Sequence, residues 1–496
     1  MKKWMGWMMA AGLMLGGALA KTTLTVGLDS DPPNLDPLLS SALVDRQVQN
    51  QIFDKLVDLD ENLKPVPMLA TGWSVEENAT VYVFKLRPGV KFQDGTEFNA
   101  AAVKFNLDRY RTAQGSRRAG ELAPVKEVQV VDNLTVRVVL KEPFAPLLAI
   151  LSDRSGMMVS PTAVQKLGAD FGNSPVGTGP FKFVERRRQD RITLAKNENY
   201  WMKGFPKVDE LIYRPFPDDD VRTANLLSGA VNVITPVAPK DLEAIRKNPN
   251  LSANVFAGIG YQGMFLNVNK GPLANKALRQ AFAATIDRDT VDKVVFLGTA
   301  EPANGPFPPS SFAYDKSIPV PKPDLELAKR KLAEGGKPQG FSFTLTIAPG
   351  PVLAQLAQVY QAMAAQAGIQ VKIEQVEFGT LLDRGTKGDF EAMAVGWSGR
   401  PDPDGNIYDF ARCKGPQNYS GYCNPKVDAL LNRARSVRLL DARRDLYTQA
   451  LKILLDDLPY VYVYHPQTTI GLSKKVSGIP AIPDGILRFR AAGLGE

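Results

Sequence analysis

The segment from Gly396 to Asn406 concentrates side chains that could recognise a polar ligand. It follows an apolar strand at 392–395 and is rich in turn-forming residues. An arginine can bind a carboxylate through two parallel hydrogen bonds, and an aspartate can pair with an amine. We expect this loop to contact a ligand; the alternative is a surface turn capped by its own side chains, with the tryptophan as ordinary packing. Its candidate contact residues are Trp397, Ser398, Gly399, Arg400, Asp402 and Asp404.

Signals of catalysis are weak in this chain. A serine nucleophile elbow of the Gly-x-Ser-x-Gly kind is missing, and the single histidine, His465, follows the apolar stretch 460–464 with no acidic neighbour to orient it. The run Asp218–Asp220 precedes a helical stretch at 221–227, where carboxylates suit a helix N-terminus better than catalysis. We expect no enzymatic activity; a secreted carboxylate-dependent hydrolase is the alternative.

The N-terminus has the pattern of a signal peptide. Lys2 and Lys3 precede an apolar stretch at 4–19, and the stretch ends in a small-x-small site at Ala18–Ala20. Cleavage before Lys21 is expected, and no cysteine follows that could carry a lipid anchor. Since no later segment is long and apolar enough to span a bilayer, the mature protein is expected to be soluble in the periplasm or another extracytoplasmic space.

Length and charge limit the remaining classes. A chain of 496 residues is expected to fold into two or three lobes. Its formal net charge of +8 falls to +6 without Lys2 and Lys3, a modest value for so large a surface. The basic run Arg186–Arg188 lies in a predicted hairpin turn and is not interleaved with aromatics, so no nucleic-acid partner is expected.

The two cysteines, Cys413 and Cys423, have nine residues between them. In an exported protein this spacing favours one local disulfide that closes a loop. A reactive thiol pair is the alternative, but the chain has no Cys-x-x-Cys motif. One histidine and two bonded cysteines leave few ligands for a soft metal, and we expect no metal or cofactor.

The elements that position these residues alternate between strands and helices. The first half predicts a strand at 21–28, a helix over 44–56, a strand at 81–86, a helix capped by Asn99 and a hairpin over 128–140. The second half has longer helices that lead into strands, 353–367 into 371–373 and 439–455 into 460–464. This pattern predicts an α/β fold.

Several motifs, in order along nearly the whole chain, resemble the peptide/opine/nickel family of bacterial extracytoplasmic solute-binding proteins, which includes the dipeptide- and oligopeptide-binding proteins of ABC importers. The longest match is Tyr82–Thr96, which contains a buried aromatic sheet face and an Asp-Gly turn. The other matching segments are Leu69–Ser74, Val176–Phe181, Asn199–Trp201, Leu227–Gly229, Ala277–Phe282 and Tyr422–Leu431.

The resemblance implies a two-lobed periplasmic-binding-protein fold with a hinge crossed twice and an extra subdomain in the first lobe. By this analogy 1–20 is the signal peptide, and lobe I comprises 21–48, 174–257 and 466–496. The extra subdomain is 49–173, and lobe II is 258–465. Closure on a ligand that contacts both lobes would present a shape that the membrane permease recognises.

The resemblance also implies a function and a set of ligand contacts. Receptors of this family hold an extended peptide between a segment after the first strand and a loop of the second lobe. The chain is then a monomeric receptor that delivers di- or oligopeptides to the transmembrane subunits of an ABC permease; opines, oligosaccharides or metal chelates are the alternative ligands. The contacts carried over, besides the loop, are Ser41, Ala42, Leu43, Phe378, Arg384 and Tyr464.

One departure concerns the amine of a peptide ligand. Dipeptide and oligopeptide receptors place an aspartate three residues after the loop tryptophan to pair with that amine, and this chain has Arg400 there. Three hypotheses follow. Asp402 could take the amine after a small shift, the ligand could present an anionic or amide group to Arg400, or Arg400 could simply pair with Asp402 or Asp404.

Overall fold

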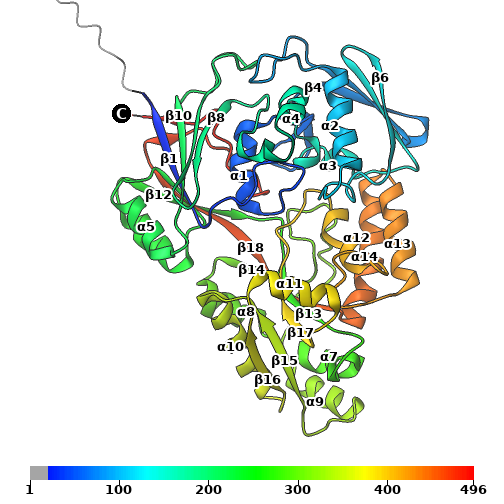
Figure 1. Ribbon diagram of the computed structural model, residues 1–496. Helices are drawn as coiled ribbons and strands as arrows, with labels where there is room; N and C mark the ends of the chain where they lie inside the picture. The colour runs from blue at the N-terminus through cyan, green and yellow to red at the C-terminus, as the bar shows by residue number, and fades with distance from the viewer. Residues whose placement is uncertain (1–20, 496) are drawn as a thin grey trace, which may run out of the picture.

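The computed structural model describes residues 21–495, so the predicted signal peptide at 1–20 lies outside the described residues. Two lobes share one large sheet, and strand β18 (Tyr460–Ser473) runs from one lobe into the other (Figure 1). None of the helices within 21–495 is long and apolar enough to cross a membrane.

The large sheet is 12-stranded and mixes parallel with antiparallel pairs. In the first lobe β1 lies parallel to β10 and β11, and in the second β15 lies parallel to β16 and β17, which confirms the predicted α/β class. Its strands in spatial order are β16 (Gln370–Gln375), β15 (Ser342–Ile347), β17 (Ala392–Ala394), β13 (Gln262–Leu266), β18, β11 (Val233–Thr235), β1 (Thr23–Leu28), β10 (Glu210–Pro215), β9 (Arg191–Lys196) and β8 (Phe181–Arg187), with β12 (Leu251–Ala257) and β14 (Ala300–Pro302) also paired to β18.

The chain crosses between the lobes at two adjacent places. The first part of β18 pairs with β13 of the second lobe, and its last part pairs with β11 and β12 of the first lobe. The second crossing is the connection from β12 to β13. His465 belongs to β18, and its side chain is buried against the other crossing. Its Nδ1 is 2.8 Å from the carbonyl oxygen of Gly260, which lies in the connection from β12 to β13. This is the predicted hinge crossed twice, with the histidine tying its two strands together.

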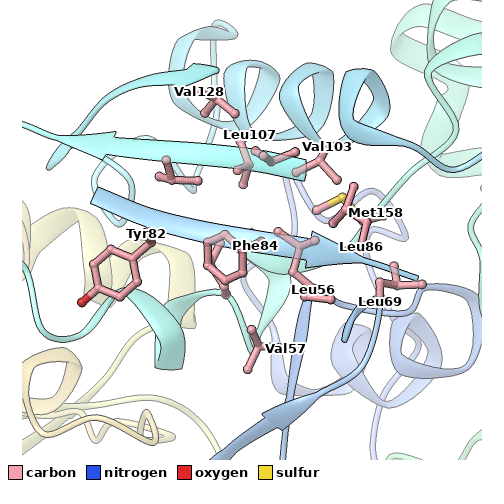
Figure 2. Packing of buried hydrophobic residues seen from close by; sticks show 14 of the residues in the cluster. Leu56, Val57, Leu69, Tyr82, Phe84, Leu86, Val103, Leu107, Val128 and Met158 are labelled. Atoms are coloured by element: carbon pink, nitrogen blue, oxygen red, sulfur yellow. The ribbon is translucent and has the colours of Figure 1, made fainter. Parts of the chain in front are cut away.

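A separate sheet of four strands forms the extra subdomain, in the order β4 (Ala70–Glu76), β5 (Val81–Leu86), β7 (Thr135–Leu140) and β6 (Val125–Asp132). Helix α2 (Ala100–Thr112) packs on the sheet beside β6 and β7, where its Val103 and Leu107 lie near Val128 (Figure 2). Phe84 of β5 belongs to the same core and lies toward Leu56 and Val57. The side chain of Asn99 accepts a hydrogen bond from Ala102 N at 3.0 Å, so the predicted helix cap is confirmed. The predicted strand at 81–86 and hairpin over 128–140 are confirmed as well.

The predicted limits of the extra subdomain, 49 and 173, stay predictions, and the packing favours narrower ones. Helix α1 (Leu43–Ile52) is cut by a boundary at 49, although Ile52 and Phe53 pack in the core of the first lobe with Val48. Met157 and Val159 belong to the same core cluster. The hydrophobic clusters therefore separate the subdomain from the lobe after Phe53 and again before Met157.

The second lobe has two core clusters, one on each side of its part of the sheet. The predicted helix–strand units at 353–373 and 439–464 are confirmed, and Cys413 and Cys423 form the predicted disulfide between α12 and α13. The helices of the second lobe are α7 (Lys276–Ala283), α8 (Arg288–Val291), α9 (Leu325–Glu334), α10 (Pro351–Ala365), α11 (Phe378–Lys387), α12 (Asp404–Ala411), α13 (Pro425–Ser436) and α14 (Leu440–Asp457).

The first lobe has further short elements. Its other helices are α3 (Leu147–Ile150), α4 (Pro161–Leu167), α5 (Asp219–Leu227) and α6 (Leu242–Lys247). Two short strand pairs are β2 (Val57–Leu59) with β3 (Pro65–Pro67) and β19 (Val476–Ser477) with β20 (Gly493–Leu494).

The two lobes touch in the described conformation. Helices α12, α13 and α14 lie beneath the extra subdomain (Figure 1). The backbone N–H of Ala145 donates to the carbonyl of Arg435 at 2.7 Å, and the Arg435 guanidinium lies 4.8 Å from the ring of Phe144. The structure therefore represents a closed arrangement of the lobes.

Candidate ligand-binding site

The loop from Gly396 to Asn406 is anchored to the hinge. Trp397 and Tyr261 exchange two backbone hydrogen bonds, of 3.0 and 2.8 Å, so the start of the loop pairs with the chain that crosses between the lobes. The side-chain oxygen of Asn406 accepts from the indole of Trp397 at 3.1 Å and from the backbone N–H of Arg400 at 2.7 Å. The predicted turn-rich loop is thus closed by its own polar groups while it sits against the hinge.

Gly399 is required at its position in this loop. Its φ of +86° is disfavoured for residues with a side chain, and a Cβ atom there would lie 2.2 Å from the carbonyl oxygen of Ile259. A side chain would therefore push the loop away from the crossing strand. Ser398 beside it is exposed.

Arg400 points toward the first lobe. Its guanidinium stacks on the Trp397 ring at 4.3 Å, and its Nε lies 3.8 Å from Oδ2 of Asp153 in the extra subdomain. Burial lowers the pKa of Arg400 to about 10, but the side chain stays cationic at neutral pH. The hypothesis that Arg400 pairs with Asp402 or Asp404 is wrong, because both aspartates have other partners.

Asp402 pairs with an arginine of its own lobe. Arg443 donates to both carboxylate oxygens of Asp402, at 2.8 and 2.6 Å, and the backbone N–H of Asp404 donates to Oδ1 at 2.9 Å. Asp404 in turn lies 3.0 Å from Nε of Arg435, and burial raises the pKa of Asp404 to about 7. Both carboxylates therefore have guanidinium partners within the second lobe. A role for Asp402 in holding a ligand amine stays a prediction that this geometry does not favour.

Three arginines of the first lobe, Arg46, Arg118 and Arg154, lie around Asp153 and face Arg400. We call the four arginines the arginine cluster. Arg46 Nε donates to Asp153 Oδ1 at 3.0 Å, and Arg154 Nε is 3.9 Å from the same oxygen. Arg118 pairs with Glu121 at 2.5 Å. Burial alone would raise the pKa of Asp153, but the neighbouring guanidiniums hold this pKa well below its usual range. Burial, together with the adjacent Arg118 and Arg400, lowers the pKa of Arg154 to about 9.

The first-lobe segment predicted to touch ligand meets the arginine cluster. Arg118 and Arg154 each donate to the carbonyl oxygen of Ser40 at 3.2 Å, which fixes the chain just before α1. The three predicted contacts that follow are accessible: Ser41 and Leu43 are exposed, and Ala42 is half-buried. The structure thus brings the 40–43 segment and the 396–406 loop to the same interlobe region through the arginine cluster.

The remaining predicted contacts have other surroundings. Phe378 begins α11 and is 52% exposed, and Arg384 on the same helix pairs with Glu374 at 2.8 Å. Tyr464 is buried in the core of the second lobe against Phe296, with ring centroids 4.4 Å apart. The ligand contacts predicted for Phe378, Arg384 and Tyr464 stay predictions.

Sequence reasoning missed the three first-lobe members of the arginine cluster. Arg46, Arg118 and Arg154 are spread over more than a hundred positions of the chain, and neither spacing nor motif connects them. Their one detectable signal is burial of charge: Arg46 lies on the helix that carries Val44 and Val48, where a charged side chain needs a buried partner. Within 21–495 the structure has no group of three His, Cys, Asp or Glu side chains that could hold a metal.

The family is decided by a match over most of the chain. Residues 64–418 match the model of bacterial extracellular solute-binding proteins, family 5, middle region. The chain belongs to this family. Since the family is one of solute-binding proteins, the predicted receptor class is confirmed, and the structure is that of an extracellular solute-binding protein.

Individual relatives of this solute-binding protein agree with the family match. It is 31% identical to the glutathione-binding protein GsiB of Pectobacterium atrosepticum, over 99% of this chain and 98% of the relative. It superimposes with a TM-score of 0.86 on the periplasmic binding protein DppA from Helicobacter pylori in complex with the peptide STSA, with 29% identity, covering 96% of this chain and 98% of that one. It also superimposes with a TM-score of 0.85 on AgaA from A. tumefaciens in complex with agropinic acid, with 26% identity, covering 96% and 99%. The predicted two-lobed fold is confirmed.

Proposed function

We propose that this chain is the substrate-binding component of an ABC importer and that it captures a short peptide between its lobes. Support comes from full-length similarity to a glutathione-binding relative and to a structure solved with a tetrapeptide. The observation that carries the proposal is the position of the 396–406 loop. Trp397 is bonded to the hinge while Arg400 faces the first lobe, so a solute between the lobes would meet this loop.

Glutathione is the first ligand to test because it is a tripeptide with two free carboxylates, and the loop offers a cation where peptide receptors of this family place an acid. An opine is the second candidate. The structure that contains agropinic acid is 26% identical to this chain and shares its fold. If the ligand is a neutral oligosaccharide or a metal chelate, the protein is still a receptor, but the peptide assignment is wrong.

The remaining features follow from the role of an importer receptor. Cleavage near Ala20 would release the mature chain into the periplasm or an equivalent space outside the cytoplasm. The protein would act as a monomer and would catalyse no reaction. The transmembrane subunits of the permease would recognise its closed form. Ligand release would then accompany reopening at the hinge strands around His465 and Gly260.

Native mass spectrometry of the mature protein, purified without unfolding, tests the proposal directly. We expect bound peptides of two to five residues, glutathione among them. Thermal shift assays with peptide pools extend the test, because a ligand at about 100 times its dissociation constant stabilises the folded state by roughly 2.7 kcal/mol. An opine, sugar or chelate as the bound species, with no shift from any peptide pool, would overturn the peptide assignment.

A further inference from the structure

The arginine cluster carries more positive charge than its surroundings neutralise. Four guanidiniums, from Arg46, Arg118, Arg154 and Arg400, meet the carboxylates of Asp153 and Glu121. A further acid, Asp45, is linked to Arg154 through the hydroxyl of Ser40, which donates to Asp45 at 2.9 Å and accepts from Arg154 at 3.1 Å. With all three acids ionised, one positive charge is still left over in a region of low dielectric.

Several polar atoms of the arginine cluster and of Asp153 are buried without a hydrogen-bond partner among the described residues. They are Nη1 of Arg46, Nε of Arg118, Nε of Arg154 and Oδ2 of Asp153. The side chains of Arg46, Arg118 and Arg154 are only 3%, 5% and 1% exposed. A buried donor that is left unsatisfied is costly, and an arginine fork matches a carboxylate. The three arginine nitrogens are donors, whereas Oδ2 of Asp153 is an acceptor. The arginine donors therefore have the chemistry of an anion site that the protein's own acids fill only in part.

Arg400 is the one member of the arginine cluster that belongs to the second lobe. When the lobes close, its guanidinium approaches three first-lobe guanidiniums, and Asp153 at 3.8 Å is its nearest opposing charge. Its stacking on Trp397 and the hydrogen bonds of its backbone fix it in that direction. An added anion between the lobes would turn this approach from partly repulsive to favourable.

We propose that a carboxylate of the ligand binds among Arg46, Arg118, Arg154 and Arg400, and that this anion drives lobe closure, so the receptor selects acidic ligands. The inference rests on the proposed receptor function and specifies the ligand class of that site. A ligand that binds the closed form better shifts the population toward it, and here the differential contact is made by Arg400. An amine at the same place would be repelled.

Calorimetry of the mature protein with glutathione and with its diethyl ester tests the inference. In the ester both carboxylates are neutral while the peptide backbone is unchanged. We expect the wild type to bind the ester roughly 10- to 150-fold more weakly, the range for loss of a charge-assisted contact. Arg400→Gln should weaken acid binding by a similar factor and leave ester binding nearly unchanged, and Arg400→Lys should recover part of the loss.

Arg187→Gln is the matched control, since this side chain is 60% exposed on β8 and should leave both affinities unchanged. Equal binding of acid and ester by the wild type, or equal losses for both in Arg400→Gln, would overturn the inference while leaving a peptide receptor. If no peptide binds but an acidic opine does, with the same loss in Arg400→Gln, the peptide proposal fails and the inference stands. If the wild type binds only a neutral ligand, or no member of the peptide and opine sets, the inference is overturned.

Discussion

Arg443 holds both carboxylate oxygens of Asp402 in a buried bidentate pair, at 2.8 and 2.6 Å, beneath the loop that carries Arg400. The hydroxyl of Tyr447 accepts a further hydrogen bond from the same guanidinium at 3.0 Å. This pair joins the loop to α14 and leaves Arg400 as the charged group of the loop that faces the first lobe. The charge of the loop at the interlobe region is therefore positive, in contrast to the acid that peptide receptors of the family present.

Asp402→Asn should destabilise the protein without changing its preference for free or acetylated peptide N-termini. Loss of the carboxylate leaves Arg443 buried with an uncompensated charge, which costs about 3 to 5 kcal/mol. Urea unfolding measures the stability and calorimetry the preference. Asp441→Asn, at a side chain 85% exposed, is the control and should change neither. A mutant that keeps its stability but loses selectivity for free N-termini would instead place Asp402 at the ligand amine.

His465 should make the protein less stable as the pH falls from about 6.5 toward 4. Burial lowers the pKa of His465 from 6.5 to about 4 in the folded state. The unfolded chain therefore takes up a proton first as the pH drops, and the resulting loss of stability approaches about 3 kcal/mol. Urea unfolding of the wild type and of His465→Gln between pH 7.5 and 4.5 measures it.

The difference in unfolding free energy between these two proteins should be constant above pH 7 and shrink below 6.5. Because the chain has one histidine, its imidazole resonance also gives the pKa directly by NMR. An imidazole that titrates near 6.5 in the folded protein would contradict the expected pH dependence.

Gly399→Ala should weaken ligand binding by displacing the loop from the hinge. The added methyl group would lie 2.2 Å from the Ile259 carbonyl, at a φ that already disfavours a side chain. We expect a loss of about 1 to 3 kcal/mol of stability, the range for strain at a special backbone conformation. The control is Gly72→Ala in β4, where an added Cβ meets no atom within 4 Å. Similar melting temperatures and affinities for the two variants would contradict this role of Gly399.

Cys413→Ser combined with Cys423→Ser should lower stability and leave ligand affinity nearly unchanged. The disulfide closes a short loop between α12 and α13, and the restriction of the unfolded chain by such a loop is worth about 2 to 3 kcal/mol. Thermal melting of the oxidised protein, the reduced protein and the double mutant measures the effect. The reduced protein should match the mutant; a large loss of affinity on reduction would mean that the disulfide also positions the ligand loop.

Elements with a strong local signal were predictable. The strand at 81–86 is a run of β-branched and aromatic residues, and Asn99 caps the helix that follows it. The hairpin of β6 and β7 turns at Asn133 and Leu134, one residue later than the Asp-Asn pair that favours a turn, so residues close along the chain decide each of these elements. The Cys413–Cys423 bond follows in the same way from proximity along the chain. Subdomain limits were less predictable, because Phe53 and Met157 join the first-lobe core through contacts distant in sequence.

The sequence by itself determined that this protein is an extracellular solute-binding protein with a polar loop at 396–406. It also showed that Arg400 stands where an acid was expected, because residue types and their order along the chain are enough for such inferences. Only the tertiary structure decided which charges of that loop are free to act. Arg443 engages Asp402 from forty-one positions away, and folding gathers Arg46, Arg118 and Arg154 opposite Arg400. Electrostatic partners are chosen by distance in space, and pairs that lie far apart along the chain leave no periodicity by which the sequence could reveal them.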